Sequence, residues 1–304
     1  MSTPNTPPGS LRFGWTLPNN WGIAGPLDVV PLGVDAERLG YDSVWVNHHV
    51  LNVGYVGDRL GDRPYYDALT MLTWVASRTT TVQLGTSVLV VPYLHPLTLA
   101  KTLATLDQLS GGRVVAGLGV GSLQAEHDAI GLCPFEKRGR YTDDAIAVLK
   151  AVWADPPGSY VGEFFRFDAL IASPKPARPI PILVGGNRPP AIRRAAGVDG
   201  WHPLGVSPSG LAERLAVIEA MRGTLDGFAV SIRWDLGADP TLSKDIATRV
   251  AEYRDAGVTE IVWSVGSADL ALQRDTLARL AGDVVGRGAP VRKFAGRSGA
   301  NASA

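Results

Sequence analysis

Short β-favouring runs alternate with longer amphipathic stretches along most of this 304-residue chain. Apolar residues recur about every 3.6 positions in the longer stretches, which predicts a helix between successive strands. The predicted strands are residues 11–15, 42–46, 81–90, 113–121, 181–186, 199–204, 228–236 and 259–265. The predicted helices are residues 27–39, 67–78, 96–109, 138–153, 208–221, 243–256 and 269–281. About eight strand–helix units within ~250 residues indicate an α/β fold, a TIM (β/α)8 barrel.

An open, doubly wound sheet is the competing architecture. It would carry a glycine fingerprint directly after the first strand. The residues that follow Trp15 read TLPNNW and provide none. We therefore expect one barrel domain over residues 11–290, with a disordered N-terminus (1–10) and a flexible tail (291–304).

One proline-rich segment, residues 155–181, interrupts the alternation of strands and helices. It is too long for an ordinary connection, so it predicts an insertion at the rim of the barrel. Its aromatic run YVGEFFRF fits either a lid over the site or a plain surface hairpin. Both interpretations stay open from the sequence.

Charge and cysteine content exclude several classes of protein. The 29 basic and 29 acidic residues balance, so no basic face for nucleic acid is expected. Cys133 is the single cysteine, which rules out an internal disulfide. The start, MSTPNTPPGS, does not resemble a signal peptide, and no apolar run approaches the ~20 residues of a membrane helix. We expect a cytoplasmic protein that acts on a small molecule.

Polar residues gather where the predicted strands end, which is where TIM barrels place their sites. This end is rich in His, Trp, Asn and Gly, as a pocket for an aromatic-ring cofactor would be. The candidate cofactor-binding residues are Asn47, His48, Ser87, Gly119, Gly121, Ser122, Gly185, Gly186, Asn187, Arg188 and Trp201.

The run Gly185-Gly186-Asn187-Arg188 precedes two prolines and a helical stretch, AIRRAA. Glycines before a helix N-terminus present free backbone N–H groups and the positive end of the helix dipole. Proline fits a first helical turn because it has no N–H to leave unpaired. The run predicts a phosphate site to which Arg188 adds a cation. An ordinary glycine turn is the alternative.

The adjacent histidines His48 and His49 point to opposite sides of an extended segment. No HExxH or similar spacing accompanies them, so we expect no metal site. Each could contact a ligand or be a buried histidine bonded to a carbonyl. No GxSxG is present, so a serine hydrolase is unsupported.

The stretch LGTSVLVVPYLHP (84–96) places a small polar triplet, Gly85-Thr86-Ser87, inside a core strand. A backbone that must approach something closely would explain it, and so would a packing accident.

Several motifs in order resemble one family. These are GYDSVWVNHHV, LGTSVLVVPYLHP, LSGGRVVAGLGVGSLQAEHDAIG, RGRYTDDAIAVLKAVW, GEFFRF, PILVGG and DGW. The chain is similar to the bacterial luciferase-like flavin and deazaflavin oxidoreductases, and most to the branch that uses coenzyme F420. The resemblance implies a non-prolyl cis peptide at Ser87-Val88, in a bulge that supports the cofactor ring. It also implies a homodimer.

The chain departs from this family at two places. An acidic residue commonly precedes the histidine after strand two, and here His48 stands at that position beside His49. In some deazaflavin relatives a glutamate in the strand-four loop donates a proton, and the matching residue here is Gln124. Glu126 matches a different acidic position, at the start of the helix.

The resemblance implies an F420-dependent oxidoreductase that transfers a hydride between the coenzyme and a small organic substrate. Histidine titrates near neutral pH, so His49 is the first candidate for the accompanying proton and His48 the second. An FMN-dependent monooxygenase and a non-catalytic flavin-binding barrel are the alternatives. An aldolase or isomerase barrel would need a strand-end lysine or paired acids, which the strand ends do not clearly show.

Overall fold

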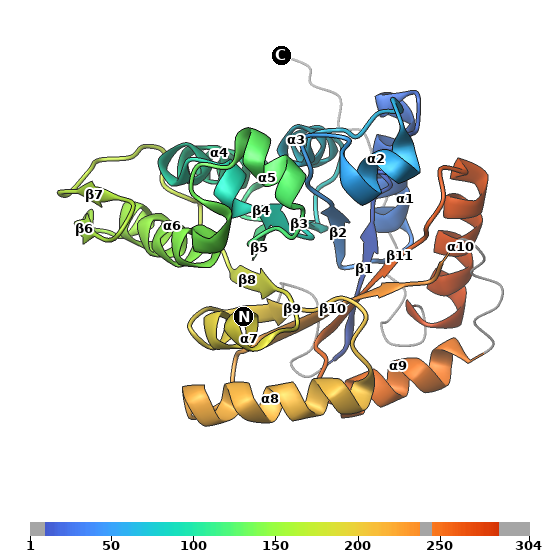
Figure 1. The fold of residues 1–304 in the computed structure, drawn as a ribbon. Coiled ribbons are helices and arrows are strands. Elements are labelled where there is room, and N and C mark those ends of the chain that lie inside the picture. Colours follow the sequence, from blue (N-terminus) through green and yellow to red (C-terminus); the bar gives the residue numbers. More distant parts are fainter. Residues whose placement is uncertain (1–9, 238–244, 286–304) are drawn as a thin grey trace, which may run out of the picture.

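Parallel strands close into a barrel in this computed structural model, which describes residues 10–237 and 245–285 (Figure 1). The strands pair in the order β3-β2-β1-β11-β10-β9-β8-β5-β4, and a further pairing of β3 with β5 closes the ring. The predicted TIM barrel is confirmed. Its strands are β1 (Arg12–Thr16), β2 (Ser43–Val46), β3 (Gln83–Thr86) continued by β4 (Leu89–Val90), β5 (Val114–Gly119), β8 (Ile182–Gly185), β9 (Gly200–His202), β10 (Ala229–Asp235) and β11 (Glu260–Ser264).

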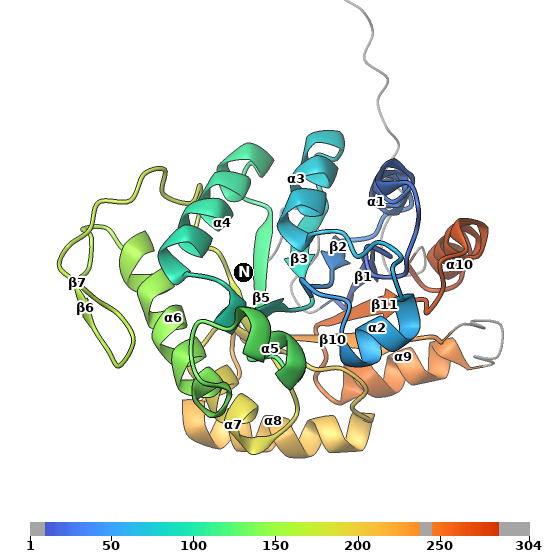
Figure 2. The ribbon, with the colours of Figure 1, turned by 45° about the horizontal axis from the view of Figure 1, so that its top comes forward.

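Helices surround the barrel because parallel neighbours need a crossover connection (Figures 1 and 2). The long helices are α1 (Val30–Arg38), α3 (Ala68–Arg78), α4 (Pro96–Ser110), α6 (Arg138–Trp153), α7 (Pro189–Ala196), α8 (Pro208–Arg222), α9 (Ile246–Asp255) and α10 (Leu270–Asp283). Short 3-10 turns lie at η1 (Pro26–Asp28), η2 (Val91–Tyr93) and η3 (Phe135–Lys137). Within the described residues, no helix is both long and apolar enough to cross a membrane.

Two short helices follow strands at the site end of the barrel. They are α2 (Gly54–Leu60) and α5 (Gln124–Ile130), which Figures 1 and 2 show at the same end of the molecule. Apolar periodicity predicted neither, because seven residues are too few to reveal a helical repeat. A helix starting near Glu126 came only from the family resemblance.

The third barrel strand contains one extra residue. Leu84 and Gly85 pair with Val114 and Val115, whereas Leu89 and Val90 pair with Leu118 and Gly119. Three residues therefore lie between the two registers on this strand, against two on β5, which is a β-bulge. The peptide between Ser87 and Val88 is cis, as the family resemblance implied.

A single large side chain fills the barrel interior below this bulge. The Trp45 indole is fully buried, and a Cβ added to Gly85 would lie 2.3 Å from its ring. A Cβ on Gly14 would lie 2.9 Å from its Nε1. Glycine at both positions is therefore required to accommodate the indole. Its other face stacks on His202, with ring centroids 4.6 Å apart.

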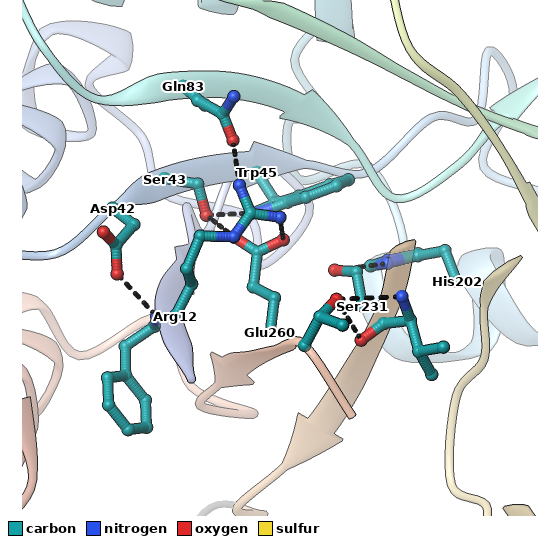
Figure 3. Close-up of polar contacts among 11 residues, drawn as sticks. Arg12, Asp42, Ser43, Trp45, Gln83, His202, Ser231 and Glu260 are labelled. Atoms are coloured by element: carbon teal, nitrogen blue, oxygen red, sulfur yellow. Dashed lines mark hydrogen bonds and ion pairs between the residues drawn. The ribbon is translucent and has the colours of Figure 1, made fainter. Parts of the chain in front are cut away.

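Below Trp45, charged and polar side chains close the amino end of the barrel (Figure 3). Trp45 Nε1 donates to Ser43 Oγ at 2.7 Å, and the Ser43 hydroxyl donates to Glu260. Arg12 bridges Gln83 Oε1, at 2.7 Å, and Glu260 Oε2, at 3.5 Å. Ser43, Gln83 and Glu260 are buried and Arg12 is partly buried, so the buried groups depend on one another and on Arg12 for their hydrogen bonds.

The segment 155–181 lies outside the barrel. Its two strands, β6 (Tyr160–Val161) and β7 (Arg166–Phe167), form an antiparallel hairpin beside α6 at the edge of the molecule (Figure 1). The Tyr160 hydroxyl and the Phe164 backbone amide both donate hydrogen bonds to the carboxylate of Asp144 on α6. This position favours the surface hairpin over the lid. The predicted termini, apart from Ser10, and the domain limit at residue 290 lie outside the described residues.

We expect Gly85→Ala to lower the free energy of unfolding by about 1–3 kcal/mol, because Trp45 is held on both faces and cannot yield. Gly282→Ala is the matched control, since nothing lies within 4 Å of a Cβ there and α10 gains a better helix former. Urea unfolding of both variants checks this. Equal stability of the two would contradict the packing account.

Candidate active site

An inward-facing layer of polar side chains lies at the carboxyl ends of four neighbouring strands. The layer consists of Thr16, Asn47, Arg233 and Ser264. Each follows an inward-facing residue of its strand by two positions, so its side chain faces inward as well. Thr16 Oγ1, Asn47 Nδ2, Arg233 Nε and Ser264 Oγ are buried and have no hydrogen-bond partner among the described residues. Buried polar groups are rarely left unpaired, so this layer is suited to a polar ligand.

Across the barrel mouth, the bulge turns Val88 inward onto two other strands. A Cβ added to Gly119 would lie 2.4 Å from Val88 Cγ2, and one on Gly185 would lie 2.9 Å from Cγ1. A Cβ added to Gly117 would lie 3.5 Å from Val88 Cγ1. The three glycines form a notch in which the half-buried Val88 presents an apolar surface at the strand ends.

Ser87 points down into the barrel. Its Oγ lies 2.8 Å from His202 Nε2. His202 Nδ1 in turn lies 3.2 Å from Ser231 Oγ (Figure 3). Burial, and then the charge of Arg233, lowers the pKa of His202 to about 3. A neutral His202 therefore fixes the Ser87 side chain from below, which leaves Val88 as the side chain that faces the mouth.

The loop after β8 holds the predicted phosphate residues. Gly186 has a φ of +98°, and Trp201 Nε1 donates to its carbonyl at 2.8 Å. Trp201 is fully buried, so it supports this loop from behind and does not line the mouth. Asn187 Nδ2 donates to the Leu204 carbonyl at 2.8 Å, while its Oδ1 has no partner in the described chain.

The N-terminus of α7 offers fewer donors than the sequence suggested. Pro189 and Pro190 occupy its first two positions and carry no N–H. The Ala191 N–H donates to the Arg188 carbonyl at 2.9 Å. A phosphate here would depend on the amides of residues 186–188 and on the exposed Arg188 side chain.

His48 is an internal structural group. Its Nδ1 accepts a hydrogen bond from the Val90 amide at 3.1 Å, which ties the β2 loop to β4. Burial lowers the pKa of His48 to about 4. Of the two interpretations, the buried histidine fits, although its partner is an N–H and not a carbonyl.

His49 pairs with a buried carboxylate. Its Nδ1 lies 2.6 Å from Glu126 Oε2, and its Nε2 lies 2.9 Å from the Tyr55 hydroxyl. Glu126 Oε1 accepts the amides of Val50 at 2.6 Å and Leu51 at 3.0 Å. Burial alone would raise the pKa of Glu126, but these bonds outweigh it and lower the pKa. The carboxylate is therefore ionised and accepts the Nδ1 proton of His49.

The strand-four loop divides the sequence candidates. Gln124, placed at the family's proton-donor position, is exposed at the start of α5, whereas Glu126 is fully buried. Gly121 has a φ of +73°, and Ser122 is exposed beside Tyr55. Sequence reasoning assigned no role to Glu126. Its one signal was that it is an acidic residue two positions after Gln124, the expected proton-donor position.

Acidification should destabilise the protein through His48. Between about pH 6.5 and pH 4 the unfolded histidine binds a proton that the folded one does not, so stability is full above this window and falls as the pH falls through it. In His48→Asn, the amide oxygen can still accept from Val90 but does not titrate. Between neutral pH and about pH 5, urea unfolding should show wild type losing about 2 kcal/mol more than this variant. Equal losses would contradict the assignment.

Comparisons with known proteins agree with this architecture. An uncharacterized protein of Mycobacterium tuberculosis is 27% identical over 247 residues, covering 77% of this chain and 83% of that protein. An F420-dependent glucose-6-phosphate dehydrogenase of Kineococcus radiotolerans is 28% identical over 324 residues, covering 86% of this chain and 92% of that protein.

A solved F420-dependent secondary alcohol dehydrogenase, in complex with an F420–acetone adduct, has a TM-score of 0.75 to this structure. The match covers 91% of this chain and 98% of that one at 18% identity, so it is a likeness of fold. Residues 12–233 match the sequence profile described as luciferase-like monooxygenase, which spans the strands from β1 into β10. The chain therefore belongs to the luciferase-like monooxygenase family.

Proposed function

We propose that this chain is an oxidoreductase that uses coenzyme F420 and transfers a hydride between that deazaflavin and a small organic substrate. The observation that carries the proposal is the Val88 surface, seated in a notch of three glycines at the strand ends. The F420-dependent relatives, among them the Kineococcus dehydrogenase, support the choice of coenzyme. The substrate itself is left open by this argument.

The residues at the mouth fit such a coenzyme. A planar heterocycle needs an apolar support, which Val88 offers, and polar groups for its edge. Thr16 and Ser264 supply buried polar atoms that have no partner within the described residues. The coenzyme's phosphate would lie on the β8 loop and the strand-four loop, at Gly185, Gly186, Asn187, Arg188, Gly119, Gly121 and Ser122. Trp201 would hold the β8 loop in place.

When bound, F420 supplies hydride chemistry, so the protein must align the substrate and handle one proton. His49 suits the proton because Glu126 occupies its Nδ1 and leaves Nε2 as the acceptor. Nε2 already accepts from the Tyr55 hydroxyl, which marks the direction from which a substrate hydroxyl would approach. His48 is unsuited because its Nδ1 is bonded to the backbone and burial keeps it neutral.

The alternatives use the same barrel. An FMN-dependent monooxygenase would place its flavin on the same Val88 surface, and no contact at the mouth favours it over F420. A non-catalytic barrel would have no use for the buried His49–Glu126 pair, whose carboxylate is fully hydrogen-bonded. We also propose that the protein is cytoplasmic and forms a homodimer. Size-exclusion chromatography with light scattering tests the oligomeric state.

Replacement of His49 should strongly reduce turnover without loss of the coenzyme. In His49→Asn no group at this position can take the proton, so kcat should fall by about 10²–10⁴-fold. The assay follows the absorbance of oxidised F420 with a panel of small alcohols, and the affinity for F420 is measured beside it. We expect that affinity to stay within about twofold, because His49 contacts Glu126 and Tyr55 and is no part of the Val88 notch.

His95→Asn is the matched control, because His95 is exposed and its ring packs against Phe165 of the hairpin. It should leave kcat unchanged. Full turnover by His49→Asn would refute the role of His49. If none of the compounds in the panel changes the F420 spectrum, that result would count against the proposed reaction.

A further inference from the structure

Two arginines lie at the mouth, one from a barrel strand and one from a short helix after β2. Arg233 comes from the end of β10 and donates to Asn47 Oδ1 of the β2 loop. Arg59 comes from α2, where it donates to the Asn20 carbonyl at 3.1 Å and lies 4.4 Å from the centre of the Trp21 ring. In the barrel order β9 stands between β10 and β8, and β3 and β5 stand between β2 and β8. Because the Arg233 guanidinium is bonded to the β2 loop at Asn47, it is directed away from the loop proposed for the coenzyme's phosphate.

Neither arginine forms an ion pair within the residues that the structure describes. Asp235 is the acidic residue whose charge acts most strongly on the Arg233 guanidinium. It is exposed, however, and its Oδ1 accepts a hydrogen bond from the Gly237 amide at 2.8 Å. Glu126 is already committed to His49 and two amides. Two positive charges thus lie at the mouth, and no carboxylate of the described residues is in direct contact with either.

Several of the unpaired groups around this charge are donors, while Asn20 Oδ1 is a buried unpaired acceptor among the described residues. Arg233 Nε, Arg59 Nε, Asn47 Nδ2 and the Tyr65 hydroxyl are all buried and unpaired among the described residues. Burial raises the pKa of Tyr65, so its hydroxyl stays protonated and able to donate. A set of N–H and O–H donors around two cations matches the oxygens of an anion.

The donors also lie beside the proposed proton acceptor. The Tyr65 ring is 5.8 Å from the His49 ring, centroid to centroid. Asn47 is two residues before His49 and holds Arg233 from the same loop. An anion bound by the arginines would therefore fix a substrate close to His49 Nε2.

We propose that Arg233 and Arg59, with Asn47 and Tyr65, form an oxyanion-binding subsite that takes a carboxylate or phosphate group of the substrate. The assignment of the anion to the substrate rests on the proposed function. The charge itself and its donors do not depend on it.

The test is a titration of the full chain, loaded with F420, with inorganic phosphate and separately with acetate at constant ionic strength. Binding is read by calorimetry. We expect one of the two to bind, phosphate if the substrate is phosphorylated and acetate if it is a carboxylate. Arg233→Gln should weaken that binding at least about tenfold, because a charge-assisted bond is lost. Arg78→Gln, on the exposed end of α3, is the matched control and should bind as wild type does.

Three results would overturn the subsite. The first is that neither anion binds to the wild-type protein. The second is that Arg233→Gln binds the anion as tightly as wild type does. The third is that an anion binds to the apoprotein and is displaced by F420, which would mean that the coenzyme occupies the site. If Arg233→Gln does not fold, Arg59→Gln replaces it, since Arg59 lies on a short surface helix. If F420 itself fails to bind, the proposed function fails, and the apoprotein titration still decides whether the arginines bind an anion.

Discussion

The site depends on one extra residue in the third barrel strand. Because the register with β5 slips by one position between Gly85 and Leu89, two successive side chains, Ser87 and Val88, both face inward. Ser87 is fixed from below by a neutral His202, and His202 stacks on Trp45. The glycines of β5 and β8 then leave the space into which Val88 packs. An apolar surface at the centre of the mouth is the result.

The mouth is divided by chemistry. The half made by β4, β5 and β8 is apolar, with Val88 among glycines. The half made by β1, β2, β10 and β11 carries polar atoms that are buried and unpaired in the described part of the chain. Glu126 differs from these atoms because every bond it needs is made within the protein. Satisfied groups hold the site rigid, and unsatisfied groups are the ones available to ligands.

The alternation of strands and helices predicted the barrel because periodicity is a local property of the sequence. The strand ends were located for the same reason, and the family resemblance supplied the cis peptide at Ser87-Val88. The sequence does not tell whether Trp201 or His202 faces inward, because a period of two predicts alternating side chains but not which of them point into the barrel. In the structure the indole of Trp201 faces the helices, and His202 lies inside the barrel against Trp45.

Contacts between distant segments were hidden for a different reason. Glu126 is separated from His49 by 77 residues, and α5 is too short to show which of its faces is buried. The need for Gly85 became visible only with Trp45 in place across the barrel. The double proline at the start of α7 could have been weighed from the sequence, because it removes the first two amides of that helix whatever the fold.

The most direct measurement is a titration of the purified apoprotein with F420 and with FMN, side by side, followed by quenching of tryptophan fluorescence. The account predicts that F420 binds tightly and FMN weakly. Preference for FMN, or no binding of either at tens of micromolar, which corresponds to only about −6 to −7 kcal/mol, would contradict it.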